Sequence, residues 1–292
     1  MRIDLHTHSD RSDGTDSPAQ LVRRAHEGGL DIIALTDHDT TAGWKAAAAE
    51  AERSEVTLVR GIEVSCTFAH HGVHLLAYLP DPAYPPLVEE LQRVLDGRNS
   101  RLPALLERLR ELGIEITVHD VRRVAGDTAA MGRPHIADAL VELGVVASRG
   151  EAFDTLLGPQ GPAYVRRYAA DLPTMIGVVA AAGGVTVVAH PWANRHNHAA
   201  LDEAGFAVLR DAGLSGIEVD HPDHDDAARR RLRAIAADLD LVVTGSSDYH
   251  GTGKVGIELG RNTTDPGELE RLLDRATAGA ARAGRGTPYS PT

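Results

Sequence analysis

The stretch Ile3-Asp4-Leu5-His6-Thr7-His8-Ser9 opens the chain with a short apolar run that ends in two histidines. Because side chains alternate across a β-strand, His6 and His8 project to the same side and can converge on one ion. A pair with this spacing also occurs by chance, and a half-buried histidine more often satisfies a hydrogen bond than binds a metal. The rest of the sequence has to decide between a metal site and a structural role.

Six further runs of β-branched residues or leucine follow along the chain, and amphipathic stretches separate several of them. The seven runs lie at residues 3–5, 32–35, 57–59, 73–77, 185–189, 216–219 and 241–244. The helical stretches lie at residues 18–27, 44–53, 172–182 and 226–237. This alternation is typical of a parallel α/β architecture.

Nearly every run ends in a histidine or an acid. Since the active site of a parallel barrel is built at the carboxyl ends of its strands, we expect these side chains to form one cluster at one mouth. The candidate metal ligands are His6, His8, Asp13, His38, Glu63, His74, His190, Asp248 and His250.

The chemistry of these side chains narrows the choice of metal. Imidazole and carboxylate without thiolate suit Zn²⁺, Mn²⁺ or Fe²⁺ better than Cu⁺ or an iron-sulfur cluster, and the residues do not choose among the three. Cations with open coordination positions would lower the pKa of a bound water and neutralise a phosphate. The sequence therefore predicts a metal site that catalyses hydrolysis.

The region of residues 97–168 interrupts the alternation. It is mostly helical in pattern, with helices expected at residues 102–112 and 135–143 and with Gly113 and Gly144 as their stops. We therefore predict three parts: a barrel domain of residues 1–96 and 169–280, a helical insertion of residues 97–168 that caps the substrate, and a frayed tail of residues 281–292.

Composition excludes several classes of protein. A chain of 292 residues with 42% hydrophobic residues can bury a sizeable core, and a net charge of -12 argues against general binding to duplex nucleic acid. The single cysteine, Cys66, allows no internal disulfide, no run is apolar enough to span a membrane, and the amino terminus does not read as a signal peptide. We expect a cytoplasmic protein without a membrane partner.

The motifs resemble the polymerase-and-histidinol-phosphatase, or PHP, superfamily. The matching segments, in the family's order, are His6-Thr7-His8-Ser9 followed by Asp13-Gly14, Leu35-Thr36-Asp37-His38-Asp39, Gly61-Ile62-Glu63, His74, Ala189-His190-Pro191 and Ser247-Asp248-Tyr249-His250. The resemblance implies an α/β fold, a distorted (β/α)7 barrel with a mainly helical insertion, and a site for three divalent ions of Mn, Zn or Fe.

The resemblance also implies how the ligands are shared. The first metal would be held by His6, His8, Glu63 and Asp248; Glu63 would bridge to a second metal bound by His74 and His190; and the third would take Asp13, His38 and His250. Some relatives have a histidine at the position of Asp13. The residues expected to take part in the chemistry are Asp13, His38, Glu63, Asp248 and His250.

Four further residues are candidates for substrate binding. Arg133 and His135 lie in Met131-Gly132-Arg133-Pro134-His135-Ile136-Ala137, just before an expected helix, where an anion is favoured and arginine grips phosphate. The alternative is a turn with a solvated arginine, but the segment resembles the subgroup that acts on nucleotides and on 5′ ends of short RNA. Arg195 could reach the mouth or lie in a surface loop, and His221 could contact substrate or cap a polar loop.

The expected reaction is phosphomonoester hydrolysis by in-line attack of a metal-bridged hydroxide, with Arg133 or Arg195 stabilising charge on the phosphoryl oxygens. The expected substrate is a small phosphorylated molecule, such as a nucleoside 3′,5′-bisphosphate, a 5′-monophosphate or a short oligoribonucleotide trimmed from its 5′ end. The alternatives are a histidinol-phosphate phosphatase and, from another class, a non-catalytic barrel that binds metal or phosphate for regulation.

Overall fold

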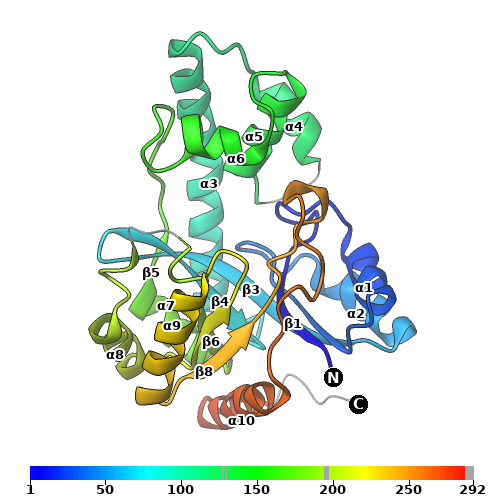
Figure 1. Cartoon of the computed structure of the whole chain (residues 1–292), viewed down its shortest axis with the longest axis vertical. Helices are drawn as coiled ribbons and strands as arrows, with labels where there is room; N and C mark the ends of the chain where they lie inside the picture. Colours follow the sequence, from blue (N-terminus) through cyan, green and yellow to red (C-terminus); the bar gives the residue numbers. More distant parts are fainter. Residues whose placement is uncertain (127, 129, 194–196, 287–292) are drawn as a thin grey trace.

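The computed structural model describes residues 1–126, 128, 130–193 and 197–286 of the chain. Within these residues, seven strands form a nearly closed barrel with helices on its outside (Figure 1). In the order in which they lie side by side, the strands are β1 (Ile3–Thr7), β2 (Ile32–Leu35), β3 (Thr57–Phe68), β4 (His71–Tyr78), β6 (Val185–Ala189), β7 (Gly216–Asp220) and β8 (Val242–Gly245). The predicted α/β barrel with a mainly helical insertion is confirmed, and each predicted run overlaps one of these strands.

One strand runs against its neighbours. β4 pairs antiparallel with both β3 and β6, whereas the other neighbouring strands of this sheet pair in parallel. A two-residue turn at Ala69 and His70, with φ angles of 47° and 68°, joins β3 to β4. The expectation of a wholly parallel barrel is therefore wrong at β4, because a strand buried on both faces shows the same apolar run in either direction. The reversal brings His74, near the start of β4, to the mouth where the other strands end.

The barrel closes between β1 and the loop after β8. The backbone N–H of His8 donates to the carbonyl of Tyr249 at 2.9 Å, and the N–H of Asp248 donates to the carbonyl of His6 at 3.0 Å. These bonds place the segment with the first candidate ligands of the chain beside the segment with the last ones. The histidines at residues 6 and 8 and the acid at residue 248 are thus brought together by backbone pairing.

Two hydrophobic clusters build the barrel. Inside it, Leu5, Leu76 and Tyr78 pack against α10 (Pro266–Arg282), which lies below the barrel, away from the helical part of the chain (Figure 1). The outer faces of the strands pack against α1 (Pro18–Glu27), α2 (Trp44–Ser54), α7 (Leu172–Ala181), α8 (Glu203–Asp211) and α9 (Asp226–Asp238). No helix of the described residues is long and apolar enough to cross a membrane.

A long helix, α3 (Pro85–Glu111), joins the barrel to the smaller helical part. Its first half packs on the barrel core, and its second half shares a separate core with α4 (Val118–Ala125), α5 (Arg133–Glu142), α6 (Arg149–Ala152) and the π-helical turn η1 (Phe153–Leu157). The helix expected at residues 102–112 is only the end of α3, and the expected boundary at residue 97 falls inside it. The helix continues past Gly97 and Pro103, because the buried side chains of Val94, Arg98, Arg101 and Leu105 keep the helical spacing there. The chain returns to the barrel through β5 (Ala170–Asp171), which pairs with β3.

Candidate metal centre

All nine candidate ligands lie together at one mouth of the barrel. They form four overlapping groups in which the potential ligand atoms lie within 4.8 Å of one another. The groups are His6, His8 and Asp248; His6, Glu63 and His190; His38, Glu63 and His74; and His8, Asp13, His38 and His250. The grouping departs from the expected sharing in three respects. His8 also approaches the third set, His190 also approaches His6, and His38 also approaches Glu63 and His74.

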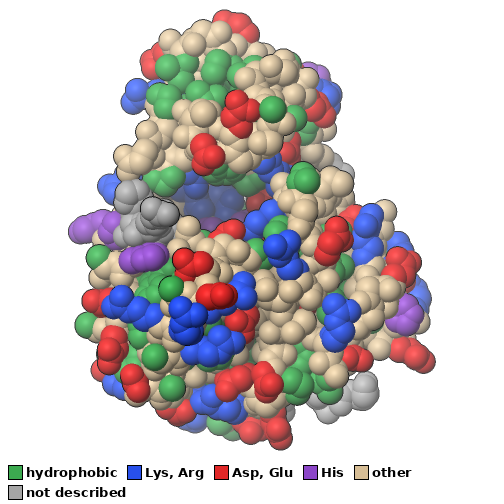
Figure 2. Space-filling view, in the orientation of Figure 1, with side chains coloured by type: hydrophobic (Ala, Val, Ile, Leu, Met, Phe, Trp, Pro, Cys, Tyr) green, Lys and Arg blue, Asp and Glu red, His purple; other side chains and the backbone are tan. Residues whose placement is uncertain are grey.

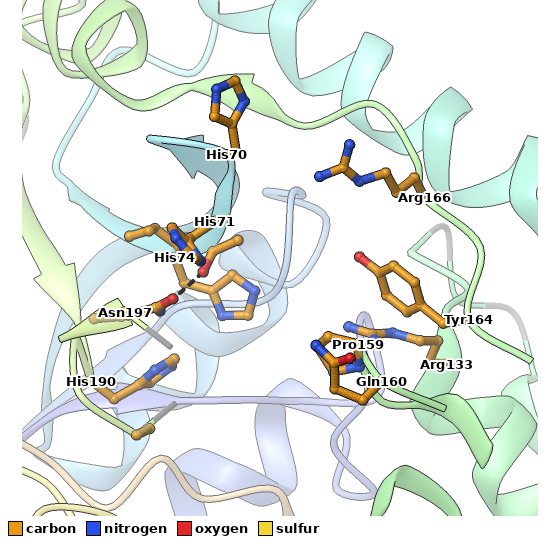
Figure 3. Close-up of a pocket in the computed structure, with 14 residues that line it drawn as sticks. His70, His71, His74, Arg133, Pro159, Gln160, Tyr164, Arg166, His190 and Asn197 are labelled. Atoms are coloured by element: carbon orange, nitrogen blue, oxygen red, sulfur yellow. Dashed lines mark hydrogen bonds between the residues drawn. The ribbon is translucent and has the colours of Figure 1, made fainter. Parts of the chain in front are cut away.

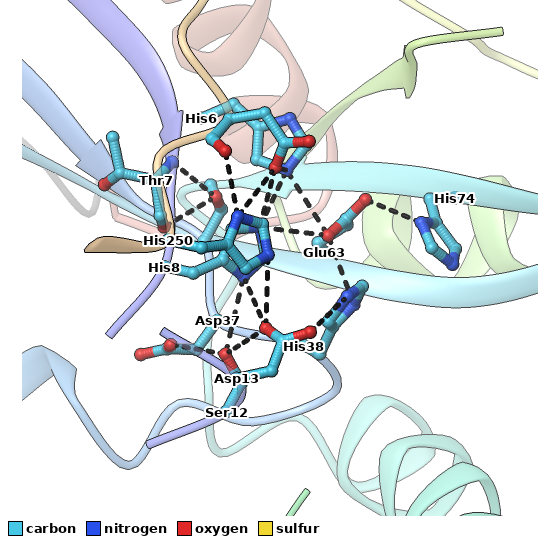
Figure 4. Close-up of polar contacts among 12 residues, drawn as sticks. His6, Thr7, His8, Ser12, Asp13, Asp37, His38, Glu63, His74 and His250 are labelled. Atoms are coloured by element: carbon cyan, nitrogen blue, oxygen red, sulfur yellow. Dashed lines mark hydrogen bonds and ion pairs between the residues drawn. The ribbon is translucent and has the colours of Figure 1, made fainter. Parts of the chain in front are cut away.

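Glu63 is the centre of this cluster (Figure 4). Its Oε1 atom lies 2.8 Å from His74 Nδ1 and 3.0 Å from His190 Nε2. Its Oε2 atom lies between 3.1 and 3.3 Å from ring nitrogens of three more histidines, which are His6, His8 and His38. A single buried carboxylate therefore touches five imidazoles, which is the geometry expected of a bridging ligand.

His6 and His8 converge as their spacing on β1 predicts. Their Nε2 atoms lie 3.0 Å apart, and both face Glu63 Oε2 and Asp248 Oδ1. Both rings are fully buried. Two ring nitrogens that point at each other and at two carboxylates leave room for one shared cation, so the pair fits a metal ion better than a hydrogen bond.

Asp13, His38 and His250 form the third set of ligands. Asp13 Oδ1 lies 3.3 Å from His250 Nε2, and Asp13 Oδ2 lies 3.6 Å from His38 Nε2. The His8 ring stacks on that of His250 with 4.1 Å between centroids. The buried Nδ1 atoms of His38 and His74 form no hydrogen bond with a described residue, although each lies close to an oxygen of Glu63. This is expected of nitrogens that share a cation with that carboxylate.

The charges at this mouth suit a metal site. Burial alone would raise the pKa values of the carboxyls Asp13, Glu63 and Asp248, but the neighbouring histidines, with Lys254 beside Asp248, hold all three well below their usual range. Burial would lower the pKa of His8, but its hydrogen bonds to Asp248 and Glu63 raise it to about 10. The ionised carboxylates therefore favour positive charge at this mouth. Divalent cations held by these carboxylates and imidazoles would supply that charge, so the donor set fits divalent cations.

Glu218 on β7 was not assigned a role from the sequence, yet it orients two ligands. Its carboxylate lies 3.1 Å from His6 Nδ1 and accepts a hydrogen bond of 2.8 Å from the backbone N–H of His190. Glu218 is fully buried. A carboxylate behind a ligating histidine fixes the ring and its tautomer. The position of Glu218 at a strand end was the signal that could have identified it.

Asp248 is likewise positioned by side chains on the side away from the candidate ligand histidines. Its Oδ2 atom lies 2.8 Å from Lys254 Nζ and 3.2 Å from His221 Nε2, whereas Oδ1 faces the ligand histidines. His221 is fully buried, and its Nδ1 accepts from the backbone N–H of Asp223. Both ring nitrogens of His221 are thus engaged, so we revise its expected substrate contact to a role in positioning Asp248.

A cleft adjoins the candidate metal ligands His74 and His190, between the barrel and the helical part. Two cavities of about 510 and 520 Å³ share the residues His70, Gly72, His74, Arg133, Tyr164 and Arg166 in their walls. Figure 2 shows the hollow with cationic and histidine side chains at its back. In Figure 3, Arg133, Tyr164 and Arg166 lie across the space from His71, His74 and His190.

Arg133 reaches this cleft from the first residue of α5, as the sequence suggested. Its Nη1 donates to the carbonyl of Leu157 at 2.9 Å, and its guanidinium lies over the rings of Phe153 and Tyr164 at 5.3 and 5.5 Å. No carboxylate among the described residues forms an ion pair with it. The arginine is held by packing while its charge remains available.

Two more arginines in the cleft wall have no assignment from the sequence. Arg101 and Arg167 also lack an ion pair within the described part of the chain, and both lie beside Arg133 in the second cavity. Burial and the guanidinium groups of Arg133 and Arg167 lower the pKa of Arg101 to about 9. Gathering uncompensated positive charge is costly unless an anion binds there.

His135 and Arg195 differ from the expectation. The Nδ1 atom of His135 accepts from the backbone N–H of Gly132 at 3.1 Å, and its Nε2 atom lies 2.9 Å from the carbonyl oxygen of Ser12. Both ring nitrogens are used inside the protein, so we revise its expected substrate contact. Arg195 lies outside the described residues.

Comparisons with known proteins agree with this geometry. Residues 4–157 match the PHP domain. The chain is 33% identical over 265 residues to a 3′,5′-nucleoside bisphosphate phosphatase of Chromobacterium violaceum, covering 90% of this chain and 92% of the relative. It is 33% identical to a 5′-3′ exoribonuclease of Haemophilus influenzae, covering 89% of this chain and 94% of the relative. It is 34% identical to a phosphoribosyl 1,2-cyclic phosphate 1,2-diphosphodiesterase of Eggerthella lenta, covering 86% and 95%.

The fold of the whole chain is also similar to a solved structure. A predicted metal-dependent phosphoesterase from Bifidobacterium adolescentis superimposes with a TM-score of 0.88 at 36% sequence identity. The match covers 94% of this chain and 96% of the other. The similarity therefore extends over both the barrel and the helical part.

Proposed function

The chain belongs to the PHP family of metal-dependent phosphoesterases, and we propose that it removes phosphate from nucleotides, with nucleoside 3′,5′-bisphosphates as the first candidates. Nucleoside 5′-monophosphates and the 5′ ends of short RNA are related substrates of the same site. We further propose that the nine ligands hold three divalent cations and that residues 97–168 cap the substrate.

The observation that carries this proposal is the row of uncompensated arginines in the cleft beside the metal ligands. Arg133 lines the cavity that also contains His74 and His190, and Arg101 and Arg167 line the adjoining one. A substrate with one phosphate at the metal ligands and a second at the arginines satisfies both sets of charges. A nucleoside bisphosphate has this distribution of charge.

The side chains have distinct tasks in this scheme. Divalent cations bound at the centre would neutralise the phosphoryl oxygens and make a coordinated water acidic enough to lose a proton near neutral pH. Glu218 and His221 keep His6 and Asp248 in position, and Arg133 binds the phosphate that is not cleaved. Tyr164 forms part of the cleft wall next to Arg133 and can contact the nucleoside.

The names of the relatives support a phosphate ester of a nucleotide or ribose, and a hydrolysis panel distinguishes these substrates. The metal-loaded protein is to be tested on a nucleoside 3′,5′-bisphosphate, a 5′-monophosphate, histidinol phosphate, phosphoribosyl 1,2-cyclic phosphate and a short 5′-phosphorylated RNA. We expect the highest kcat/KM for the bisphosphate. A higher value for histidinol phosphate or for the cyclic phosphate would refute the proposed substrate class, and no hydrolysis of any would favour a regulatory barrel.

Replacing Arg133 with Ala is expected to raise KM for the bisphosphate about 10- to 100-fold, since a hydrogen bond to a charged group contributes roughly 1.5–3 kcal/mol. Metal content and the hydrolysis of a simple aryl phosphate should stay within about twofold of wild type. Arg108→Ala, at an exposed position of α3, serves as the control. Equal losses on both substrates would show that Arg133 does not recognise the nucleotide.

A further inference from the structure

Side chains of the helical part hold the loop that carries Asp13. This loop follows β1, and three successive backbone carbonyl oxygens in it, those of Arg11, Ser12 and Asp13, accept hydrogen bonds from residues more than a hundred positions away. The three donors come from separate segments of the helical part. Asp13 itself is one of the proposed metal ligands, so these contacts lie next to the metal centre.

The contacts are specific in geometry. Thr128 Oγ1 lies 2.8 Å from the carbonyl oxygen of Arg11 and 3.1 Å from that of Ser12. His135 Nε2 lies 2.9 Å from the same oxygen of Ser12, and its Nδ1 is occupied by the Gly132 N–H, so Nε2 is the nitrogen that donates.

Arg149 completes the set. Its Nη1 donates to the carbonyl oxygen of Asp13 at 3.1 Å, while its other nitrogens pair with Asp138. The guanidinium also packs on Gly253, where an added Cβ would lie 2.4 Å from Nη1. Gly253 belongs to the turn η3 (Gly251–Gly253), which directly follows His250. Arg149 therefore contacts the loops that carry two ligands of the same metal group.

Among the described residues, the hydrogen bonds inside this loop use carbonyls other than those of Ser12 and Asp13. Its internal hydrogen bonds turn it back on itself, with the N–H groups of Ser12 and Gly14 both donating to the carbonyl of Ser9. Gly14 is packed so closely that a Cβ would lie 2.4 Å from the carbonyl oxygen of His8. The carbonyls of Ser12 and Asp13 receive their hydrogen bonds from side chains of the helical part, and buried carbonyls that lose their partner are costly.

We infer that Thr128, His135 and Arg149 are positioning residues that hold Asp13 in place for the third metal, so that the helical part completes the metal centre as well as capping the substrate. The inference rests on the proposed metal centre. The first turn of α5 connects substrate binding with support of the metal centre, because it presents Arg133 to the cleft and His135 to the loop that carries Asp13. A substrate phosphate that orders this turn would also strengthen the hydrogen bond from His135 to the loop that carries Asp13.

The test uses the whole chain with Thr128→Val and His135→Gln combined. Valine matches threonine in shape and removes the hydroxyl, and glutamine at the third residue of α5 can still accept from the Gly132 N–H while losing the bond to Ser12. We expect the weakest of the Mn²⁺ sites to lose about 10- to 100-fold in affinity, as is usual when the support of a ligand is removed. The tighter sites should change less than about threefold.

A second measurement does not depend on metal or activity. In the metal-free protein, amide hydrogen exchange in residues 10–14 should become at least about tenfold faster in the double variant. The control is Thr117→Val, which removes the N-cap of α4 and weakens the helical part without touching the loop. Arg149→Met provides an independent variant with the same expectation.

Three results would overturn the inference: Mn²⁺ affinities within twofold of wild type, unchanged exchange in residues 10–14, or equal losses in the Thr117→Val control. Failure of the substrate proposal is separable, because neither measurement requires turnover. A protein that hydrolyses none of the tested phosphates would still show whether the helical part holds Asp13.

Discussion

Replacing Glu63 with Gln is expected to lower kcat/KM by about a thousandfold or more, the largest loss from any single change at the metal centre. The carboxylate touches five histidine rings, and both of its oxygens are used. An amide removes the negative charge and turns an N–H₂ group toward nitrogens that should face cations. Roughly 4 kcal/mol of lost charge stabilisation corresponds to this factor.

The measurement is steady-state hydrolysis together with the metal content of the purified variant. His74→Gln is the matched comparison, because His74 contacts only one oxygen of Glu63 and its side chain is 34% exposed; we expect a smaller loss there. Glu107→Gln, in an exposed ion pair of α3, controls for the substitution itself. If the Glu63 variant kept more than about a tenth of wild-type activity, its bridging role would be refuted.

The barrel could be predicted from the sequence because each strand contains a short apolar run and nearly every run ends in a histidine or an acid. The position of His6 and His8 on one side of β1 follows from strand geometry alone. What periodicity does not encode is direction. β4 shows the same kind of apolar run as the strands that pair in parallel, and the tight turn at Ala69 and His70 reverses its direction.

The residues that support the site were harder to predict than the ligands. Glu218 lies far along the chain from His6, and only its place at a strand end marks it. Lys254 lies six residues after Asp248, but nothing in its local sequence distinguishes it from a surface charge. Arg167 had no assignment from the sequence, although it lies in the cleft wall. Such roles depend on which loops the fold brings together, and local patterns carry little information about that.

The role of His135 was also hard to predict, because it too depends on which segments the fold brings together. Its place beside Arg133 at a helix start suggested an anion site, yet the ring caps α5 and bonds to Ser12. Helix starts offer N–H groups to anions and to the protein's own side chains alike. The sequence identifies the helix start, but the partner that satisfies it is a tertiary feature.

A buried ion pair also links the barrel to α3, and its loss is expected to be the most destabilising change. Asp39, at the mouth of the barrel, accepts from Arg98 Nε of α3 at 2.5 Å and from the N–H and Oγ of Ser65 at 2.6 and 3.0 Å. Both charged side chains are buried, with 0% exposure for Asp39 and 6% for Arg98. Removing one partner leaves the other charge buried without compensation.

Asp39→Asn is therefore expected to lower the free energy of unfolding of the metal-free protein by about 3–5 kcal/mol at pH 7, measured by urea denaturation. Asparagine matches the size of aspartate and tolerates the left-handed φ of 56° at this position, so the change isolates the charge. Burial would raise the pKa of Asp39, but Arg98 brings it below its usual value. A carboxyl whose pKa is lowered in the folded state stabilises the fold at pH values above its ordinary pKa of about 3.9. This stabilisation is lost as the pH falls through the folded-state pKa, so the difference between wild type and variant should narrow below about pH 4. Asp211→Asn, in an exposed pair with Arg210, should cost less than about 1 kcal/mol; a similar cost at both positions would mean that the buried pair does not hold the two parts together.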